Sequence, residues 1–546
     1  MADTTKVTIR QVLYFITLPV ITGIAYGWEV GGMGGILAMP QFLDYMDTPT
    51  DFRQGLMTAS LIAGEFVGTI LIGLVSDRFG RRMTIWICIG IYLAGQVVLV
   101  AAQSQGMFIA GRVINGFGAG PWFQTVSFYS AEVTPPHIRG RVAASLNSGI
   151  AVGILMAYWM QYGALNIAST AAWRLCFALQ LLPGLMVGAL IFARPESPRW
   201  LVQHNQDSQA ISILADLHSQ GDTNDNFVRI EYAEIRASVD LEKSGHTPSY
   251  LALLVNPLYR RRTALAMGLQ CMQQLSGANI VLYYAAKVFA QTGRTGSSAA
   301  LLANGISSAL LLVGTVSLTL LIDFYGRRKP IFVGHSSMGI CLVIVASILL
   351  RYGSPHFDQV TQAVQFSFQN TSAGNAAVAF MFLFQFFFGA FSSSLPWTYH
   401  SEVFPLLARA RGTSLAVAAN FFTNFWLGLY IPRALNAAGW KLYYIFGAIN
   451  LGCALIGYLF YPETAGRMLE ELDLLFTPDR NVWVFMDRDA KSKQGLVGKG
   501  LEGDPAAVRR ELMVRLGGND RQDTLPAQEG ALGGEKEDVS FHHREL

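Results

Sequence analysis

The sequence predicts an all-α membrane protein with twelve transmembrane helices arranged as two six-helix pseudo-repeats. Three observations predict this class. Of the 546 residues, 52% are hydrophobic and only 14% are charged, whereas about 25% are charged in a typical soluble domain. Twelve apolar stretches are each long enough to cross a bilayer, which takes about 20 residues. Charged motifs at the ends of these stretches recur in the second half of the chain.

The twelve stretches fall into two groups of six, separated by a polar segment. They cover residues 12–36, 57–75, 84–102, 107–130, 142–163 and 173–193, and then 263–287, 299–322, 331–350, 377–399, 413–432 and 440–461. No small-residue cleavage site follows the first stretch, so we expect a retained helix rather than a signal peptide. The domains expected from this division are an N-terminus (1–11), two six-helix bundles (12–193 and 263–461), a linker (194–262) and a tail (462–546) that is largely disordered after about residue 480.

The distribution of Lys and Arg predicts the orientation, because cytoplasmic loops carry an excess of them. The short loops 76–83, 131–141, 323–330 and 400–411 hold ten, and the six loops on the other side hold four. Both termini and the linker are therefore expected in the cytoplasm. Asn370 begins an Asn-Thr-Ser triplet in a loop assigned outside, which makes it a glycosylation candidate. We expect a plasma-membrane protein, although a vacuolar location would give the same pattern.

An internal repeat is the strongest feature of the sequence. The run DRFGRR at 77–82 returns as DFYGRR at 323–328, and Ser-Ala-Glu-Val at 130–133 has its echo in Ser-Glu-Val at 401–403. Pro-Glu-Ser at 195–197 returns as Pro-Glu-Thr at 462–464. Parallel repeats with a substrate site between the two halves are a transporter architecture.

With these motifs the chain resembles a fungal-type sugar porter of the major facilitator superfamily, over about residues 12–476. The motifs that carry the resemblance are GLVSDRFGRR at 73–82, PESPRWL at 195–201, QQLSG at 273–277 followed by Asn279, EVFP at 402–405, and PETAGRMLEELDLLF at 462–476. The resemblance implies the major facilitator fold and transport of a sugar or polyol by alternating access.

The acidic and basic residues at the cytoplasmic helix ends are expected to form an inter-helix charge network that locks the two halves together in the outward-facing state. Anchoring by positive charge alone would explain the arginines but not the paired acids. The expected members are Asp77, Arg81, Glu132, Arg139, Glu196, Arg199, Asp323, Arg327, Glu402, Arg409 and Glu463.

Neutral polar residues within apolar helices are the substrate-site candidates, because amides offer both donors and acceptors to a polyhydroxyl ligand. They are Gln273, Gln274, Asn279, Tyr283, Trp397, Asn424 and Asn147. Gly277 is expected to break its helix and turn these groups inward, and Pro396 to kink its helix and present Trp397. The alternative role for such amides is inter-helix hydrogen bonding. Asn147 and Leu311 stand where many family members carry Gln and Asn, so a pentose, a polyol, a disaccharide and a ring acid stay open beside a hexose.

Ionisable residues inside the membrane are costly and usually functional. Glu29 lies about 24 Å along the first helix, sixteen residues after Leu13, and Arg112 is its expected partner. Protonation of Glu29 would release Arg112, which would couple proton entry to substrate binding. The alternative is a structural salt bridge without proton turnover. Glu65 is a second buried acid whose role the sequence leaves open among a titrating site, a substrate contact and a neutral carboxyl.

The sequence predicts a transporter that binds a polyhydroxyl substrate, protons and the lipid bilayer. The net charge of +3 disfavours nucleic-acid binding, no enzyme motif is present, and neither a cofactor nor a metal is expected. Proton symport is the favoured function. A passive facilitator and a transporter-like nutrient sensor are the alternatives, and a monomer is the expected state.

Overall fold

The computed structural model describes residues 9–243, 248–282, 297–358, 363–368, 370–465 and 482–491, together with 472, 475 and 476. Almost all of this chain is helical. The predicted Tyr283 lies outside the described residues, as do the side chains of Arg139 and Asp323.

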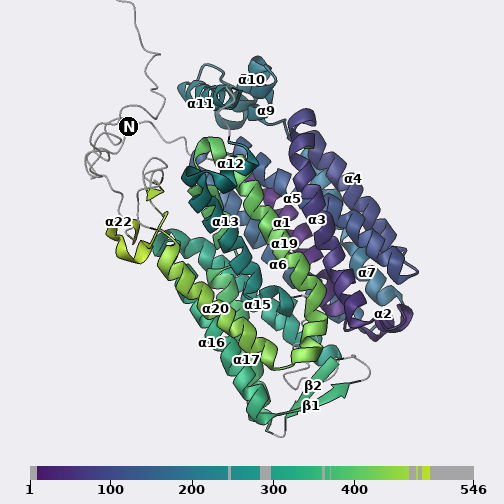
Figure 1. Ribbon diagram of the computed structural model, residues 1–546. Coiled ribbons are helices and arrows are strands. Elements are labelled where there is room, and N and C mark those ends of the chain that lie inside the picture. The colour runs from purple at the N-terminus through teal and green to yellow at the C-terminus, as the bar shows by residue number, and fades with distance from the viewer. Residues whose placement is uncertain are drawn as a thin grey trace, which may run out of the picture. The chain divides into compact units, whose positions relative to one another are not determined.

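The N-terminal half forms long helices that run back and forth across the molecule (Figure 1). Their bounds are α1 Ile9–Ile36, α3 Asp51–Phe79, α4 Arg81–Val100, α5 Gln105–Val133, α6 Pro136–Ala164, and α7 Ala171–Leu179 continued by α8 Leu181–Phe192. A short helix, α2 Pro40–Tyr45, lies between the first two. These helices match the first six predicted spans and extend several of them at their ends.

The polar linker is folded. It contains α9 Pro198–Gln203, α10 Asp207–His218, α11 Asn226–Lys243 and α12 Tyr250–Val255. Figure 1 shows α9, α10 and α11 together at one end of the molecule. Helix α13, Pro257–Leu275, then begins where the Asn256 side chain accepts a hydrogen bond from the Leu258 amide at 3.0 Å, which is the usual way to satisfy a free helix amide.

The C-terminal half repeats the arrangement. Its helices are α13, α15 Ser297–Tyr325, α16 Arg328–Tyr352, α17 Thr371–Phe391, α18 Leu395–Val403, α19 Leu406–Ala438 and α20 Lys441–Phe460, and the last described elements are η1 Val484–Met486 and α22 Arg488–Lys491. Two antiparallel strands, β1 Gly353–Asp358 and β2 Ala363–Phe368, pair from Gly353 with Phe368 to Asp358 with Ala363. The sequence did not predict this hairpin, which occupies part of a segment read only as a loop.

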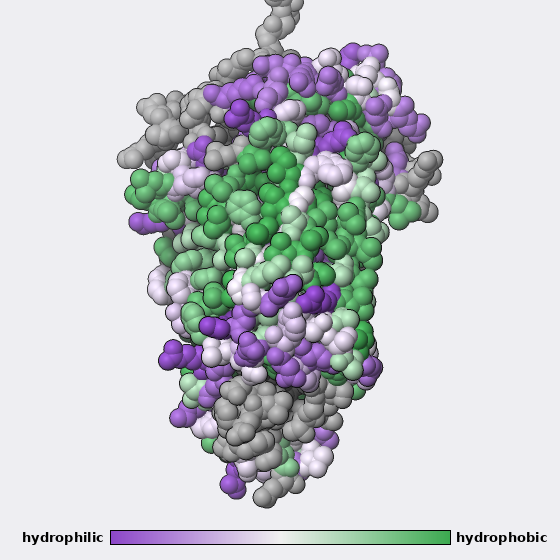
Figure 2. Space-filling view, turned by 90° about the vertical axis from the view of Figure 1, so that its right-hand side faces the viewer, coloured by the Kyte–Doolittle hydropathy of each residue, from purple (hydrophilic) through white to green (hydrophobic). Residues whose placement is uncertain are grey.

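Length and composition allow nine of the described helical segments to span a membrane. The three predicted spans that do not meet this criterion lie in α5, α6 and α13. Helix α5 buries Arg112, Asn115, Gln124 and several glycines, so its interior position lowers its hydropathy. Figure 2 shows a broad band of hydrophobic side chains between two hydrophilic ends, as expected for a protein embedded in a bilayer.

Glycines set the closest helix packing in the N-terminal half. A Cβ added to Gly23 or Gly27 of α1 would collide with the backbone of α6 at Leu146 or Ile150. Small residues of this kind let membrane helices approach closely, and here they hold α1 against α6 and bring Glu29 to a fixed depth.

Candidate functional site

Six amides, from α13, the residues just after it and α19, form one largely buried hydrogen-bonded cluster. The Asn420 amide nitrogen donates to the side-chain oxygens of Gln270, at 2.7 Å, and Gln273, at 3.0 Å. Gln274 donates to Asn420 Oδ1 at 2.7 Å. Asn279 donates to Gln274 and, at 2.9 Å, to Asn424. The structure thus brings together four of the predicted substrate residues, and Gln270 and Asn420 join them.

Two helix interruptions lie beside this cluster: one at Gly277, where the sequence predicted a break, and one just before Pro396, where it predicted a kink. Helix α13 ends at Leu275, and Gly277 has a φ of +89°, a conformation that favours glycine. The chain is also irregular between α17 and α18, where the carbonyls of Ser392 and Ser393 accept hydrogen bonds from Gln273 at 3.1 and 2.7 Å. Pro396 lies in the first turn of α18. The Ser392 and Ser393 carbonyls just before this helix are the acceptors for the side-chain amide of Gln273 on α13.

Trp397 lies between the two halves of the molecule. Its ring centroid is 6.1 Å from that of Phe123 on α5 and 5.8 Å from that of His400. His400 Nδ1 is 3.0 Å from Gln270 Nε2, so the indole stands beside the amide cluster. Asn147 is half-buried on α6, and Leu311 is buried on α15.

Glu29 and Arg112 form the predicted buried ion pair. Arg112 Nη1 donates to Glu29 Oε1 at 3.0 Å, and the two side chains are 0% and 2% exposed. Two buried opposite charges must pair because an isolated charge is costly in a membrane interior. The predicted partnership is confirmed; its role in proton coupling stays a prediction.

Glu65 lies on α3 close to this pair. It is 1% exposed, shares a hydrogen bond with the Tyr26 side chain and acts electrostatically with Glu29 and Arg112. Its Oε1 atom has no hydrogen-bond partner among the described residues. The described N-terminal half therefore buries two carboxyl groups, Glu29 and Glu65, near the guanidinium of Arg112.

In the N-terminal half, the residues of the charged motif form hydrogen bonds with one another. Arg81 donates to both oxygens of Glu132, each at 3.1 Å, and Ser197 donates to Glu132 at 2.5 Å. The backbone amides of Arg81 and Arg82 donate to Glu196. Burial raises the pKa of the Glu196 carboxyl above its usual range, while these amides and that of Ser197 lower it.

The C-terminal motif repeats these bonds atom for atom. Arg327 donates to Glu402 at 3.2 and 2.7 Å, and Thr464 donates to Glu402 at 2.6 Å. The amides of Arg327 and Arg328 donate to Glu463 at 2.8 and 3.2 Å. Gly80 and Gly326 precede the two arginine pairs with φ of +85° and +82°. The internal repeat is thus preserved in side-chain chemistry.

These bonds of the predicted network lie within one half or the other. Asp77 is 3.5 Å from Arg81 in its own half, and its side chain is mostly exposed. Arg199 and Arg409 lie at the starts of α9 and α19. A link across the halves stays a prediction.

The halves contact each other at the end remote from the charged motifs. Asn436 near the end of α19 donates to Asp51 at the start of α3 at 2.6 Å, and Tyr158 donates to the Leu282 carbonyl. Asp51 is 28 residues before Phe79 on α3, hence about 42 Å from it. A Cβ on Gly55 would collide with the Leu429 carbonyl, so the backbones touch there.

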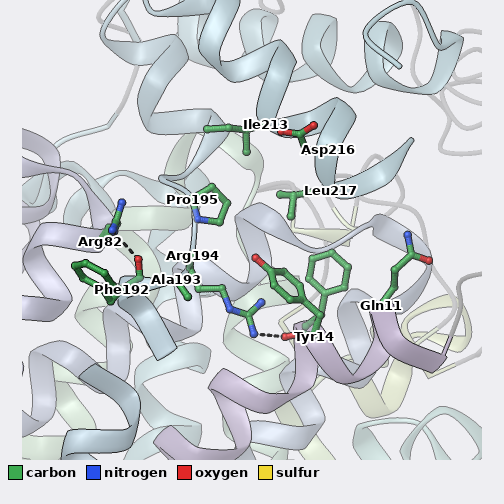
Figure 3. A pocket seen from close by; sticks show the side chains of 11 residues that line it. Gln11, Tyr14, Arg82, Phe192, Ala193, Arg194, Pro195, Ile213, Asp216 and Leu217 are labelled. Atoms are coloured by element: carbon green, nitrogen blue, oxygen red, sulfur yellow. Dashed lines mark hydrogen bonds between the residues drawn. The ribbon is translucent and has the colours of Figure 1, made fainter. Parts of the chain in front are cut away.

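A separate cavity of about 640 Å³ lies between the start of α1, the end of α8 and α10 of the linker (Figure 3). Among the described residues, no predicted substrate residue lines it. Arg194 reaches across it to the Tyr14 carbonyl at 2.5 Å, and Arg82 donates to the Phe192 carbonyl at 2.7 Å. These bonds tie the end of α8 to α1 and α4 below the linker helices.

The family model for the sugar (and other) transporter family matches residues 15–476. The chain belongs to this family. It is therefore a membrane transporter and not an enzyme, and the twelve-helix fold is that of the major facilitator superfamily.

Relatives in this sugar transporter family include fungal hexose carriers. The high-affinity glucose transporter of Kluyveromyces lactis is 33% identical over 471 residues, which cover 85% of the chain and 84% of that protein. The high-affinity fructose transporter ght6 of Schizosaccharomyces pombe is 30% identical over 492 residues, covering 88% and 89%.

Solved structures share the fold. The proton:xylose symporter XylE bound to 6-bromo-6-deoxy-D-glucose is 26% identical with a TM-score of 0.68, covering 86% of the chain and 99% of that structure. The inward open conformation of XylE from E. coli has a TM-score of 0.67 at 24% identity, covering 85% of the chain and all of that structure.

Sequence reasoning missed Gln270 and His400. Gln270 lies three and four residues before Gln273 and Gln274, which is one helical turn, so the spacing itself places the three amides on one face. His400 has no such signal, because only the break before α18 turns it toward α13.

Asn370, the glycosylation candidate, is exposed and accepts a hydrogen bond from the Ser372 amide at 2.9 Å at the start of α17.

Proposed function

We propose that this member of the sugar transporter family is a secondary active transporter that carries a neutral sugar or polyol together with a proton. The Glu29–Arg112 pair carries the proposal: two charges 3.0 Å apart, sealed from solvent inside the helical bundle. Burying such a pair costs free energy, and ionisable residues inside a membrane usually have a function.

The substrate class follows from the chemistry of the amide cluster. Its described members offer amide donors and acceptors, with the imidazole of His400 and the indole of Trp397 beside them. Arg112 is already paired with Glu29, so it does not offer its charge to a carboxylate substrate. A neutral polyhydroxyl molecule fits this set, and the printed names of the glucose, fructose and xylose carriers above agree with it.

The side chains also suggest how transport would alternate. The two halves are in contact at Asp51 and Asn436, and each charged motif at the other end is closed within its own half. We place the charged end, both termini and the linker in the cytoplasm of a plasma-membrane protein, because Lys and Arg collect there. This arrangement then corresponds to a transporter closed toward the outside.

The test is uptake of labelled hexoses, pentoses, polyols, a disaccharide and quinate into transporter-deficient cells, with and without a protonophore. The wild-type chain is expected to accumulate at least one neutral substrate, and the protonophore to abolish accumulation. Glu29→Gln removes the partner of Arg112 and is expected to abolish accumulation as well. One proton moving across about 100 mV can drive about 50-fold accumulation.

Uptake that only equilibrates, and that neither the protonophore nor Glu29→Gln affects, would show a facilitator instead. No uptake of any substrate by protein detected at the cell surface would contradict transport and favour the sensor. Surface labelling of each variant supplies the control for folding and delivery.

A further inference from the structure

Glu65 has surroundings that the transport mechanism above does not use. It lies on α3, packed against α5 so closely that a Cβ on Gly120 would come within 2.9 Å of its Cα and Cβ. The same contact seals it, leaving the side chain 1% exposed. A carboxyl at this depth in a membrane protein is costly unless it is neutralised.

The groups that act on Glu65 come from two helices. Helix α1 supplies Tyr26 and Glu29, and α5 supplies Arg112. Arg112 Nη1 is bonded to Glu29 Oε1 at 3.0 Å, whereas Glu65 shares a hydrogen bond with Tyr26. Helix α4 adds Tyr92, which acts electrostatically with Glu29 and Arg112. Helix α19 meets α3 near this level through Phe422, whose ring lies 6.3 Å from that of Phe66.

Counting charges leaves one proton to place. Two ionised carboxylates and one guanidinium would leave a net negative charge sealed in an apolar interior, which is strongly unfavourable. Glu29 accepts the bond from Arg112 and is best placed to stay ionised. Each of the two carboxyls has one oxygen without a partner among the described residues, so the partners decide: Glu65 shares its bond with a neutral hydroxyl and Glu29 with a guanidinium, and the proton belongs on Glu65.

A continuous set of ring contacts connects Glu65 to the substrate residues. The ring of Tyr26 stacks on Phe123 with centroids 4.3 Å apart and planes 22° apart. Phe123 meets Trp397 edge-on at 6.1 Å, and Trp397 stands beside the amide cluster. A change at Glu65 that moves Tyr26 would therefore disturb the contact between the two halves.

We propose that Glu65 is a second proton-binding site, and that it holds the transported proton while Glu29 stays ionised against Arg112. The inference rests on the proposed proton-coupled transport. Loading forms one carboxyl O–H bond on Glu65, and release breaks it and returns the proton to water. No other bond changes.

The first test is the infrared spectrum of the purified full-length protein in lipid at neutral pH. The wild-type chain is expected to show the carbonyl band of a buried protonated carboxyl, and Glu65→Gln to lack it. Thr69→Val changes another buried polar side chain, one turn away on α3, and is expected to keep the band. A band that persists in Glu65→Gln overturns the inference.

The second test is transport by the same variants. Glu65→Gln mimics the protonated acid, so accumulation should fall from about 50-fold to onefold while exchange of sugar across the membrane continues. Tyr26→Phe removes the hydroxyl partner without changing charge, and serves if Glu65→Gln does not reach the membrane. It should lower accumulation in the same direction.

The outcomes separate the two proposals. If the wild type accumulates the sugar and Glu65→Gln accumulates it equally, the inference about Glu65 is wrong and symport stands. If the wild type only equilibrates the sugar, symport is wrong, and the transport role of Glu65 with it.

Discussion

Asn420 is the residue on which the amide cluster depends. Its amide group makes three hydrogen bonds, to Gln270, Gln273 and Gln274. Asn420→Ala would leave three buried amides short of a partner, at a cost of about 1–3 kcal/mol for each unsatisfied group. We expect the KM for the sugar to rise by about tenfold or more, measured by initial rates of uptake.

A matched variant distinguishes substrate binding from general damage. Asn115 is a buried amide of the other half, bonded to Gln96 at 2.7 Å and away from the cluster. Asn115→Ala should lower thermal stability with a smaller change in KM than Asn420→Ala. Equal KM values for Asn420→Ala and wild type would contradict a role of the cluster in substrate recognition.

The sequence was enough to predict the partners of charged residues that lie in otherwise apolar helices. Glu29 and Arg112 were predicted to pair because each is a lone charge in an apolar helix, and they do. The contact between Tyr26 and Glu65 was not predictable, because it depends on the rotation of α1 against α3. Sequence spacing fixes neighbours within a helix, but not which faces of two helices meet.

At the scale of elements, one histidine joins helices α10 and α11 of the linker to the end of α5. His218 at the end of α10 lies 2.6 Å from a Glu231 oxygen through Nδ1 and 3.1 Å from the Val133 carbonyl through Nε2. The two ring nitrogens thus reach oxygens on two different helices. This side chain therefore ties α10 and α11 to the end of α5, next to Glu132.

His218→Ala should release the linker helices from the bundle. The bond to the Glu231 carboxyl alone is worth about 1.5–3 kcal/mol if it resembles other bonds to charged groups, so proteolytic cleavage within 207–243 should become at least about tenfold faster. His204 is exposed directly after α9, and His204→Ala is the control that should leave cleavage unchanged. Unchanged cleavage of His218→Ala would show that other contacts hold the linker.

Some helices and strands could be predicted from the sequence, and others could not. The apolar stretches predicted the division into two groups of six helices. The repeated charged motifs predicted that the two halves would have similar structures. The hairpin of β1 and β2 was not foreseen, since a short two-stranded ribbon depends on its surroundings for stability. The sequence did not show that the arginines of each charged motif bond to Glu132 or Glu402 of the same half, because this depends on how the helix ends lie in three dimensions.

For the whole molecule, the contact between α3 and α19 at the end remote from the charged motifs is the one that the proposed alternating transport would break and remake. Gly55 allows it, because a Cβ there would overlap the backbone carbonyl of Leu429. Rotation of a side chain cannot relieve a clash with backbone. Gly55→Leu should therefore hold this end apart, and the cost of overpacking, about 1–3 kcal/mol, predicts about tenfold slower uptake.

Binding and transport should respond differently to Gly55→Leu. The substitution lies far from the amide cluster in sequence and blocks closure rather than recognition, so purified Gly55→Leu should still bind the sugar that wild type carries. Gly90 of α4 is the matched control, because a Cβ there meets no atom within 4 Å, and Gly90→Leu should transport normally. Normal uptake by Gly55→Leu at equal surface levels would mean that the halves need not close at α3 and α19, and the alternating mechanism would then need a different outer contact.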